Sequence, residues 1–384
     1  MSTDAKVAIW RSTLLPASET FVRSQANALR RWQPTVVGAV RVSSAIANDS
    51  DVMAFPDGAP GRRAFHRLRV TGGSSRLRAV LTDIRPDIVH AHFGGDGWLI
   101  SRSAVQLGIP LIITLHGRDV TVQPHARGVR GARYRRNLRT AFARSAAILA
   151  VSESIRARAI DLGADPAKVR VHHTGVPIPD APTASTITWD VAYVGRFVDK
   201  KGIDDLIEAV GMIRPVQPRV VLIGDGPLSA AMRERAQRLG LDASFLGACE
   251  PSVVAACVAA SRVFVAPSKT AADGDTEGLP TTILEAASLG LPTISTDHSG
   301  IPEAVVHGQT GILCAENAPS ELAAAIRRLL VDDALRARMG QQARRHVESH
   351  FDIRHQTRLL EDIYDSVAVR PRVDATRTVH GGSR

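Results

Sequence analysis

The sequence predicts an α/β protein built from two consecutive doubly wound domains, each a parallel sheet covered by helices. Short apolar runs alternate with segments of helical periodicity along both halves of the 384 residues. Residues 174–188 interrupt this alternation with three prolines among Ala, Thr and Ser, which is typical of an interdomain linker. Polar residues follow directly after several apolar runs, and doubly wound sheets bind their ligands at that position.

Individual elements follow from apolar runs and from helix start and stop signals. Strands are expected at residues 6–10, 35–40, 87–94, 110–115, 146–151, 169–173, 190–195, 219–223, 263–267 and 291–296. Helices are expected at residues 20–32, 153–162, 203–213, 320–331, 335–349 and 351–367. The domains are accordingly 1–175 and 189–350, joined by a linker at 176–188 and followed by the 351–367 helix. Residues 368–384 hold several arginines and almost no large apolar side chain, which predicts a disordered basic tail.

Composition narrows the classes of function. The net charge of +10 comes mostly from arginine, concentrated at residues 62–78 and 127–144. Such runs serve nucleic acid, an anionic membrane or an anionic substrate, or they are ordinary solvated helix faces. Aromatic residues make up only 4% of the chain and form no stacking pattern beside the arginines, which argues against nucleic acid. The three cysteines lack C-x2-C spacing, so neither a zinc site nor a disulfide framework is expected.

The expected localisation follows from the absence of a membrane-spanning run and of a signal-peptide pattern. No run approaches the ~20 apolar residues needed to cross a bilayer, and the N-terminal segment leads directly into a strand without a signal-peptide pattern. We therefore expect a cytoplasmic protein. Docking of the basic first domain on the anionic inner face of a membrane is a further hypothesis.

The most informative stretch is residues 277–303. Glu277 precedes Gly278-Leu279-Pro280, and Pro280 suits the start of a helix because its missing N–H would be unpaired there. Glu285 is the only ionisable side chain from residue 278 to 296, on a helix that we expect to be almost wholly buried. A buried carboxylate needs a partner, and the vicinal hydroxyls of a ribose would supply one.

This stretch resembles the E-x7-E signature of retaining GT-B glycosyltransferases of family 4, the group 1 glycosyl transferases. The blocks Glu-Gly-Leu-Pro, Leu-Glu-Ala, Gly-Leu-Pro and Gly-Ile-Pro-Glu occur together and in order. The resemblance implies a GT-B fold, with two Rossmann-like domains facing a central cleft and a C-terminal helix that crosses back to the first domain. It also implies that Glu277 lies near the donor sugar and that residues 278–280 (Gly278, Leu279 and Pro280) border the donor.

Two cations mark a phosphate site in the second half. Arg196 and Lys201 lie on a loop that follows a predicted strand and ends at a predicted helix N-terminus, an arrangement that favours a diphosphate. The pattern G-R-F-x3-K-G is similar to the family segment that grips the donor phosphates. Gly224 follows the next strand at a Gly-x-Gly turn and is a weaker donor-binding candidate. An ordinary solvated loop is the alternative.

Acceptor-side candidates lie in the first half. His116 follows a predicted strand directly, where α/β folds place their chemistry, and the H-G-x-D segment implies contact with the donor sugar and the reacting region. His92 ends another strand. The H-x-H pair at residues 90 and 92 could suggest a metal site, but no third ligand is near in the sequence. Glu19 and Thr20 belong to an S-E-T-F segment that resembles one in bacterial exopolysaccharide enzymes of this family, although a helix cap explains them equally well.

Asp273-Gly274-Asp275 resembles the D-x-D metal motif of the other main glycosyltransferase fold. Because Arg196 and Lys201 already supply positive charge to a diphosphate, we predict that no metal or other cofactor is required beyond the nucleotide-sugar co-substrate. The resemblance implies transfer of a hexosyl-type sugar, with retention, to a saccharide or lipid-linked saccharide in cell-surface or exopolysaccharide biosynthesis, closest to the colanic-acid type. A same-fold nucleotide-sugar epimerase, a phosphorylase and a non-catalytic binder of sugar nucleotide or nucleic acid are the alternatives.

Overall fold

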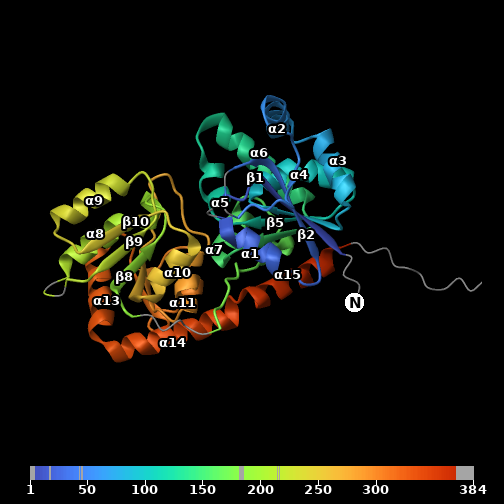
Figure 1. The fold of residues 1–384 in the computed structure, drawn as a ribbon. Helices are drawn as coiled ribbons and strands as arrows, with labels where there is room; N and C mark the ends of the chain where they lie inside the picture. The colour runs from blue at the N-terminus through green and yellow to red at the C-terminus, as the bar shows by residue number, and fades with distance from the viewer. Residues whose placement is uncertain are drawn as a thin grey trace, which may run out of the picture.

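Two parallel sheets, one in each half of the chain, form the molecule (Figure 1). The computed structural model describes residues 5–16, 19–42, 44, 46–180, 186–213, 215 and 217–368. Every strand pairing in both sheets is parallel, and helices cover the sheet faces. The predicted fold class is confirmed.

The first sheet has the order β3-β2-β1-β4-β5-β6-β7. Its strands are β1 (Lys6–Leu14), β2 (Gln33–Arg41), β3 (Val52–Met53), β4 (Ile88–His92), β5 (Leu111–Leu115), β6 (Ala147–Ala150) and β7 (Val169–Val171). Its helices are α1 (Thr20–Ala28), α2 (Ala59–Thr71), α3 (Ser75–Ile84), α4 (Gly94–Gln106), α5 (Arg118–Thr121), α6 (Gly128–Arg144) and α7 (Glu153–Asp161). Every residue of β4, β5 and β6 is buried, as central parallel strands covered on both faces must be.

The second sheet has the order β10-β9-β8-β11-β12-β13. Its strands are β8 (Trp189–Val194), β9 (Val220–Ile223), β10 (Ala243–Gly247), β11 (Ser261–Ala266), β12 (Thr293–Thr296) and β13 (Gly311–Cys314). Its helices are α8 (Ile203–Met212), α9 (Ser229–Arg238), α10 (Pro251–Ala259), α11 (Thr281–Ser288), α12 (Ile301–Ala304), α13 (Pro319–Val331) and α14 (Asp333–His350). The edge strands β10 and β13 were not predicted, because they carry few large apolar residues.

Strand order defines where ligands can bind. In the first sheet the direction of strand addition reverses between β1 and β4, and in the second sheet it reverses between β8 and β11. Ligands of doubly wound folds bind at the carboxyl ends of the strands beside such a reversal. The loops that follow these strands contain Glu19, Arg196 and Asp275, and His92 is the last residue of β4; the sequence analysis singled out all four.

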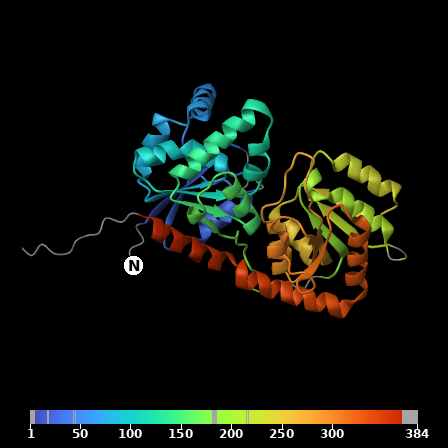
Figure 2. The same cartoon turned by 180° about the vertical axis from the view of Figure 1, so that it is seen from behind.

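The last helix, α15 (Ile353–Val367), returns from the second domain and packs on the first (Figures 1 and 2). Its Glu361 carboxylate accepts the backbone N–H groups of Arg30 and Arg31 at 2.7 and 2.6 Å. These contacts take the place of further helical turns, so α1 ends at Ala28 although the apolar pattern predicted a helix to residue 32. The Tyr364 ring packs on Trp32 at 5.2 Å between centroids.

Two crossings between the domains run side by side. Val176, at the start of the predicted linker, donates its N–H to the Phe351 carbonyl at 2.8 Å and accepts from Ile353 at 3.0 Å. Gly175 fits here because an added Cβ would lie 2.6 Å from the Ile353 Cα. One apolar cluster spans both domains, joining Val151 of the first to residues of the second. Residues 181–185 of the linker and 369–384 of the tail lie outside the described residues, so the predicted disorder of the tail stays a prediction.

Candidate active site

The loop after β8 carries the two predicted phosphate-binding cations. Arg196 is exposed, and within the described part of the chain no hydrogen bond or ion pair engages its guanidinium. The Lys201 Nζ lies 2.8 Å from the Glu277 Oε1, so this lysine joins the two segments that the sequence had singled out separately. Gly224 packs directly on the same loop, because an added Cβ would lie 1.9 Å from the Gly195 carbonyl oxygen.

Glu277 is a buried carboxylate held in its ionised form. Its side chain is 8% exposed and also accepts a hydrogen bond from the Ser268 hydroxyl at 3.3 Å. Burial alone would raise its pKa, but the ammonium groups of Lys201 and Lys200 outweigh that effect and lower the pKa to about 2. The carboxylate is therefore a fixed negative charge beside the phosphate-binding loop.

The sequence analysis missed a histidine that positions this acid. The Glu277 N–H donates to His298 Nε2 at 3.1 Å, so the proton on this ring lies on Nδ1, which donates to Glu316 Oε1 at 2.6 Å. Ser299 adds a hydroxyl hydrogen bond of 2.6 Å to the Glu277 carbonyl. The only sequence signal is that His298 and Ser299 follow β12, within the motif that predicts the next helix.

Residues 278–280 press against the first domain. An added Cβ on Gly278 would lie 2.0 Å from the His116 carbonyl oxygen, so only glycine permits this approach of two backbones. Gly117 faces the same contact and has φ of 139°, a region open to glycine. Leu279 is buried, and Pro280 is the N-cap residue of α11, one position before the first helical residue, where the sequence analysis had expected the helix to start with Pro280 itself.

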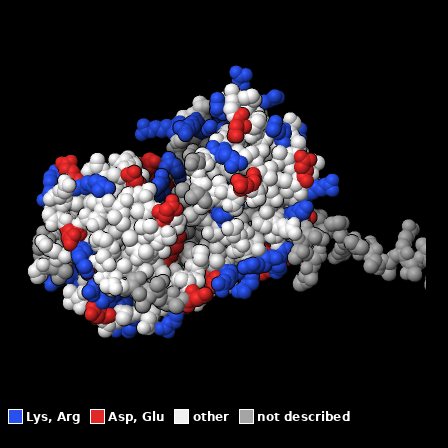
Figure 3. Space-filling view, in the orientation of Figure 1, with Lys and Arg blue, Asp and Glu red and all other residues white. Residues whose placement is uncertain are grey.

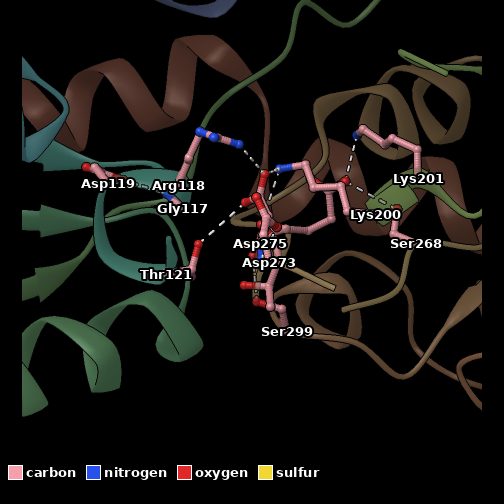
Figure 4. Close-up of polar contacts among 12 residues, drawn as sticks. Gly117, Arg118, Asp119, Thr121, Lys200, Lys201, Ser268, Asp273, Asp275 and Ser299 are labelled. Atoms are coloured by element: carbon pink, nitrogen blue, oxygen red, sulfur yellow. Dashed lines mark hydrogen bonds and ion pairs between the residues drawn. The ribbon is translucent and has the colours of Figure 1, made fainter. Parts of the chain in front are cut away.

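Asp275 connects the two domains through ion pairs (Figure 4). Its Oδ2 lies 3.2 Å from Arg118 Nη1 of the first domain and 3.3 Å from Lys200 Nζ of the second. Thr121, also of the first domain, approaches Oδ1 at 3.5 Å. Asp273 accepts the N–H of Asp275 at 3.0 Å, which orders the loop. The Asp275 carboxylate of the D-x-D segment is thus paired with protein cations.

The position of Glu285 differs from the prediction of a buried carboxylate. Its neighbours Ile283, Leu284, Ala286 and Ala287 are buried, whereas Glu285 itself is exposed. The helical period places position 285 on the opposite side of α11 from its apolar neighbours, so the helix is amphipathic and not wholly buried. The surrounding protein still desolvates the carboxyl and raises its pKa, with opposition from a Thr281 hydrogen bond.

Histidines gather where β4 and β5 end. His92 Nδ1 lies 3.0 Å from His116 Nε2, and the two rings stack with centroids 5.2 Å apart. Burial lowers the pKa of His116 to about 3 and that of His92 well below its usual range, so the pair is neutral at physiological pH. Asp119 fixes the His116 loop by accepting the N–H groups of His116 and Gly117 at 3.2 and 2.9 Å.

Glu19 lies in a buried charge cluster that the sequence did not predict. Arg11 donates to both Glu19 oxygens, at 2.7 and 2.5 Å, and also pairs with Asp96. Asp96 further accepts from the Ser12 N–H and hydroxyl at 2.7 and 2.6 Å. Thr20 begins α1, and no described contact links its side chain to the cluster. Ser18, part of the S-E-T-F segment, lies outside the described residues.

A cavity of about 920 Å³ opens beside this cluster in the first domain. Its walls come from the loops after β1 and β4 and from α2, α4, α5 and α6. Arg11, Glu19 and Asp119 line its inner end, and the Phe93 ring at that end lies 4.6 Å from the His116 ring. Arg118 also lines the cavity and pairs with Asp275 of the second domain, so the cavity extends to the contact between the domains.

Within the described residues, no group of three or more His, Cys, Asp or Glu side chains has an arrangement that could hold a metal ion. No helix in the described ranges combines the length and the apolar character needed to span a membrane.

Two family descriptions match the chain in succession. "Glycosyltransferase Family 4" matches residues 18–178, and "Glycosyl transferases group 1" matches residues 181–346. Among solved structures, Anabaena Alr3699/HepE in complex with UDP has a TM-score of 0.76 at 19% identity, covering 94% of this chain and 100% of that one. The fold is thus that of the GT-B glycosyltransferases.

Curated relatives give the same result. "Putative colanic acid biosynthesis glycosyltransferase WcaL" of Escherichia coli is 31% identical over 287 residues, which are 71% of this chain and 69% of that protein. Glycogen synthase of Mycobacterium tuberculosis is 30% identical over 72% of this chain and 68% of its own length. Amylovoran biosynthesis glycosyltransferase AmsK of Erwinia amylovora is 28% identical, with coverage of 80% and 78%. The chain belongs to the group 1 glycosyltransferases of family 4, a retaining family, as its motifs predicted.

Proposed function

We propose that this glycosyltransferase moves a sugar from a nucleoside-diphosphate sugar to a saccharide or lipid-linked saccharide, in cell-surface or exopolysaccharide biosynthesis. The biosynthetic setting is suggested by relatives named for colanic acid and amylovoran. A solved structure of similar fold is titled as a complex with UDP-glucose. The donor base and sugar of this chain are therefore sought first among UDP-, GDP- and ADP-sugars.

The observation that carries the proposal is that Arg196 lies on the same loop as Lys201 and that its guanidinium forms no ion pair or hydrogen bond within the described residues. A guanidinium and an ammonium on one loop, followed by the N-terminus of α8, suit a diphosphate. We assign the diphosphate to Arg196 and Lys201, with Gly224 and residues 278–280 bordering the donor. Glu285, exposed at the surface of α11, is assigned to the ribose hydroxyls.

The reaction breaks the bond between the anomeric carbon and the donor phosphate oxygen, and forms a bond from that carbon to an acceptor hydroxyl oxygen. The acceptor proton leaves on the departing phosphate, on the same face of the sugar. Fixed cations stabilise the growing charge on the phosphate without reorganising. Glu277 orients the sugar hydroxyls, and its negative charge stabilises the positive charge that develops at the anomeric carbon. His116 contacts the donor sugar at the reacting centre.

The test is a thermal-shift panel of UDP-, GDP- and ADP-sugars, with and without chelator. A donor at about 100 times its dissociation constant adds roughly 2.7 kcal/mol of stability, which is visible as a higher melting temperature. We expect a shift with one donor class, unchanged by chelator and lost in Arg196→Ala. Arg327→Ala, at an exposed arginine of α13, is the matched control and should keep the shift.

Two outcomes would count against the proposal. A donor response that appears only with added metal would assign Asp273 and Asp275 to a metal site. Conversion of the donor sugar to an epimer with no acceptor present would indicate an epimerase.

The basic outer face of α6 is the proposed contact with an anionic membrane. Arginines 135, 136, 139 and 144 line a shallow groove there, and Lys and Arg side chains project from this half of the molecule (Figure 3). Flotation with liposomes should increase with the fraction of anionic lipid and fall with salt. Flotation that does not depend on the fraction of anionic lipid would contradict this part of the proposal.

A further inference from the structure

The acidic side chains that line the cavity of the first domain do not neutralise all of the positive charge in its lining. The carboxylates that line it are Glu19, Asp96 and Asp119. Glu19 and Asp96 are both paired with Arg11, and Asp119 accepts three backbone N–H groups. No carboxylate of the lining is therefore left to neutralise the other cations of the cavity.

Arg118 of the lining pairs with Asp275, and the three remaining arginines come from two helices. Arg69 comes from α2, and Arg130 and Arg133 come from α6. Arg133 Nη2 donates to the Arg69 carbonyl at 2.5 Å, which joins α6 to α2 here, and the Arg69 guanidinium lies 5.9 Å from the Phe65 ring. Within the described residues none of the three forms an ion pair with an acid. The lining has no free carboxylate to neutralise these three arginines, and arginine forks suit phosphate oxygens.

Apolar side chains adjoin the same arginines. Val129 precedes Arg130 on α6 and is 84% exposed, and Val70 follows Arg69 on α2 and is 52% exposed. Both line the cavity, together with the rings of Trp98 and Tyr134. An anion site beside exposed aliphatic and aromatic side chains suits a ligand that has a charged group and a hydrophobic chain.

We propose that this cavity binds the acceptor as a phosphorylated lipid. The phosphate or diphosphate group lies against Arg69, Arg130 and Arg133, and the chain leaves over Val70 and Val129. The saccharide end reaches inward toward Arg11, Glu19 and the His116 loop, where the sugar is added. This inference rests on the proposed function, since it names the acceptor of that same reaction.

Calorimetric titration of three probes tests the inference. The probes are farnesyl diphosphate, farnesol and inorganic diphosphate, titrated into the Arg196→Ala protein so that the donor phosphate site does not contribute. We expect farnesyl diphosphate to bind at least about tenfold more tightly than either other probe, because only this probe engages both the arginines and the valines.

Variants separate the two parts of the site. Arg69→Gln and Arg130→Gln should each weaken farnesyl diphosphate about tenfold, while Arg327→Gln, which removes the same charge from α13, should not. Val129→Asp should weaken farnesyl diphosphate more than inorganic diphosphate. Equal binding of farnesyl diphosphate and inorganic diphosphate would overturn the lipid part, and binding unchanged by Arg130→Gln would overturn the anion part. A sugar acid such as glucuronate that competes more tightly than farnesyl diphosphate would replace the lipid with an anionic saccharide.

The two proposals fail separately. Farnesyl diphosphate binding that persists when no sugar nucleotide binds the parent protein would overturn the donor assignment alone. A donor response that is normal in a protein with no farnesyl diphosphate binding would overturn the lipid acceptor alone.

Discussion

At the scale of single residues, the charge state of Glu277 matters most. The ammonium groups of Lys201 and Lys200 outweigh the cost of burying its carboxylate. An acid held ionised in this way cannot serve as a proton donor at neutral pH, so its contribution is electrostatic and orienting. The proton of the acceptor must therefore leave by another route, for which the donor phosphate is suitable.

Glu277→Gln should lower stability in a pH-dependent way. The folded pKa of about 2 lies below the unfolded value of roughly 4.3, so ionisation stabilises the fold above pH ~4.3 and this contribution is lost as the pH falls toward 2. A shift of this size corresponds to roughly 3 kcal/mol at neutral pH. Melting temperatures at a series of pH values should show the parent and Glu277→Gln converging as the solution becomes acidic.

Glu234→Gln is the matched control, because Glu234 is a surface carboxylate of α9 with 69% of its side chain exposed. Its melting curve should follow that of the parent at every pH. A constant difference between Glu277→Gln and the parent across the whole series would show that the lost stability does not come from ionisation of Glu277.

Among the predicted site residues, the structure brings Lys201 and Glu277 together in an ion pair. Arg196 and Lys201 lie in the segment between β8 and α8, Glu277 lies in the loop between β11 and α11, and a local motif marks each of them. The Arg11–Asp96 pair carries no such mark, because its partners are 85 positions apart and meet only when β1 lies beside β4. His298 was missed for the same reason, since its role depends on a loop 21 residues away.

At the scale of elements, the loop that precedes α11 packs closely against the loop that follows β5. Gly278→Ala places a Cβ 2.0 Å from the His116 carbonyl oxygen, so the two loops must separate. We expect kcat to fall at least about tenfold, because reacting groups on opposite loops lose alignment. Affinity for the nucleoside diphosphate should change less, since Arg196 and Lys201 both lie in the second domain. Steady-state kinetics together with nucleotide titration measures the two effects.

Gly73→Ala is a suitable control, because its Cβ would meet only the flexible Arg102 side chain, at 3.3 Å. Its kcat should match that of the parent. A Gly278→Ala protein with normal kcat would mean that the close approach of the two loops is not needed for transfer.

Helix α15 stabilises the first domain through a buried hydrogen bond. Tyr364 is 0% exposed, and its hydroxyl lies 2.6 Å from His90 Nδ1. Tyr364→Phe leaves that ring nitrogen unpaired and should cost about 1–3 kcal/mol of unfolding free energy. Ser366→Ala, which removes an exposed hydroxyl from the same helix, should cost far less. Denaturant unfolding of both variants measures the difference, and equal losses would contradict a special role for the Tyr364 contact.

The helices hold two features that the sequence patterns did not predict. The apolar composition around Glu285 led to an expectation of burial on all sides, but the helical period leaves that position facing outward. The cavity was equally hidden, because α2 and α6 read in sequence only as arginine-rich helices. The side on which those arginines meet depends on how the two helices pack on α4, and no local pattern encodes that packing.

At the scale of the whole molecule, Asp275 couples the two domains. It is 5% exposed and neutralises Arg118 of the first domain and Lys200 of the second. Removing its charge leaves two cations facing each other across the domain contact, where they repel. The two-domain plan was predictable from alternating patterns, but this pairing was not, because the sequence offered only a resemblance between residues 273–275 and a D-x-D motif.

Asp275→Asn should therefore favour a more open arrangement of the domains. We expect a larger radius of gyration by small-angle X-ray scattering and a lower kcat, with the difference in size shrinking when a nucleotide sugar binds. Glu208→Gln is the control, because its Arg235 partner lies in the same domain and the change should leave the size unaltered. Added divalent ions should not restore kcat in Asp275→Asn, and loss of parent activity on chelation would instead identify Asp275 as a metal ligand. An unchanged radius of gyration would mean that apolar contacts such as those of Val151 hold the domains together without this carboxylate.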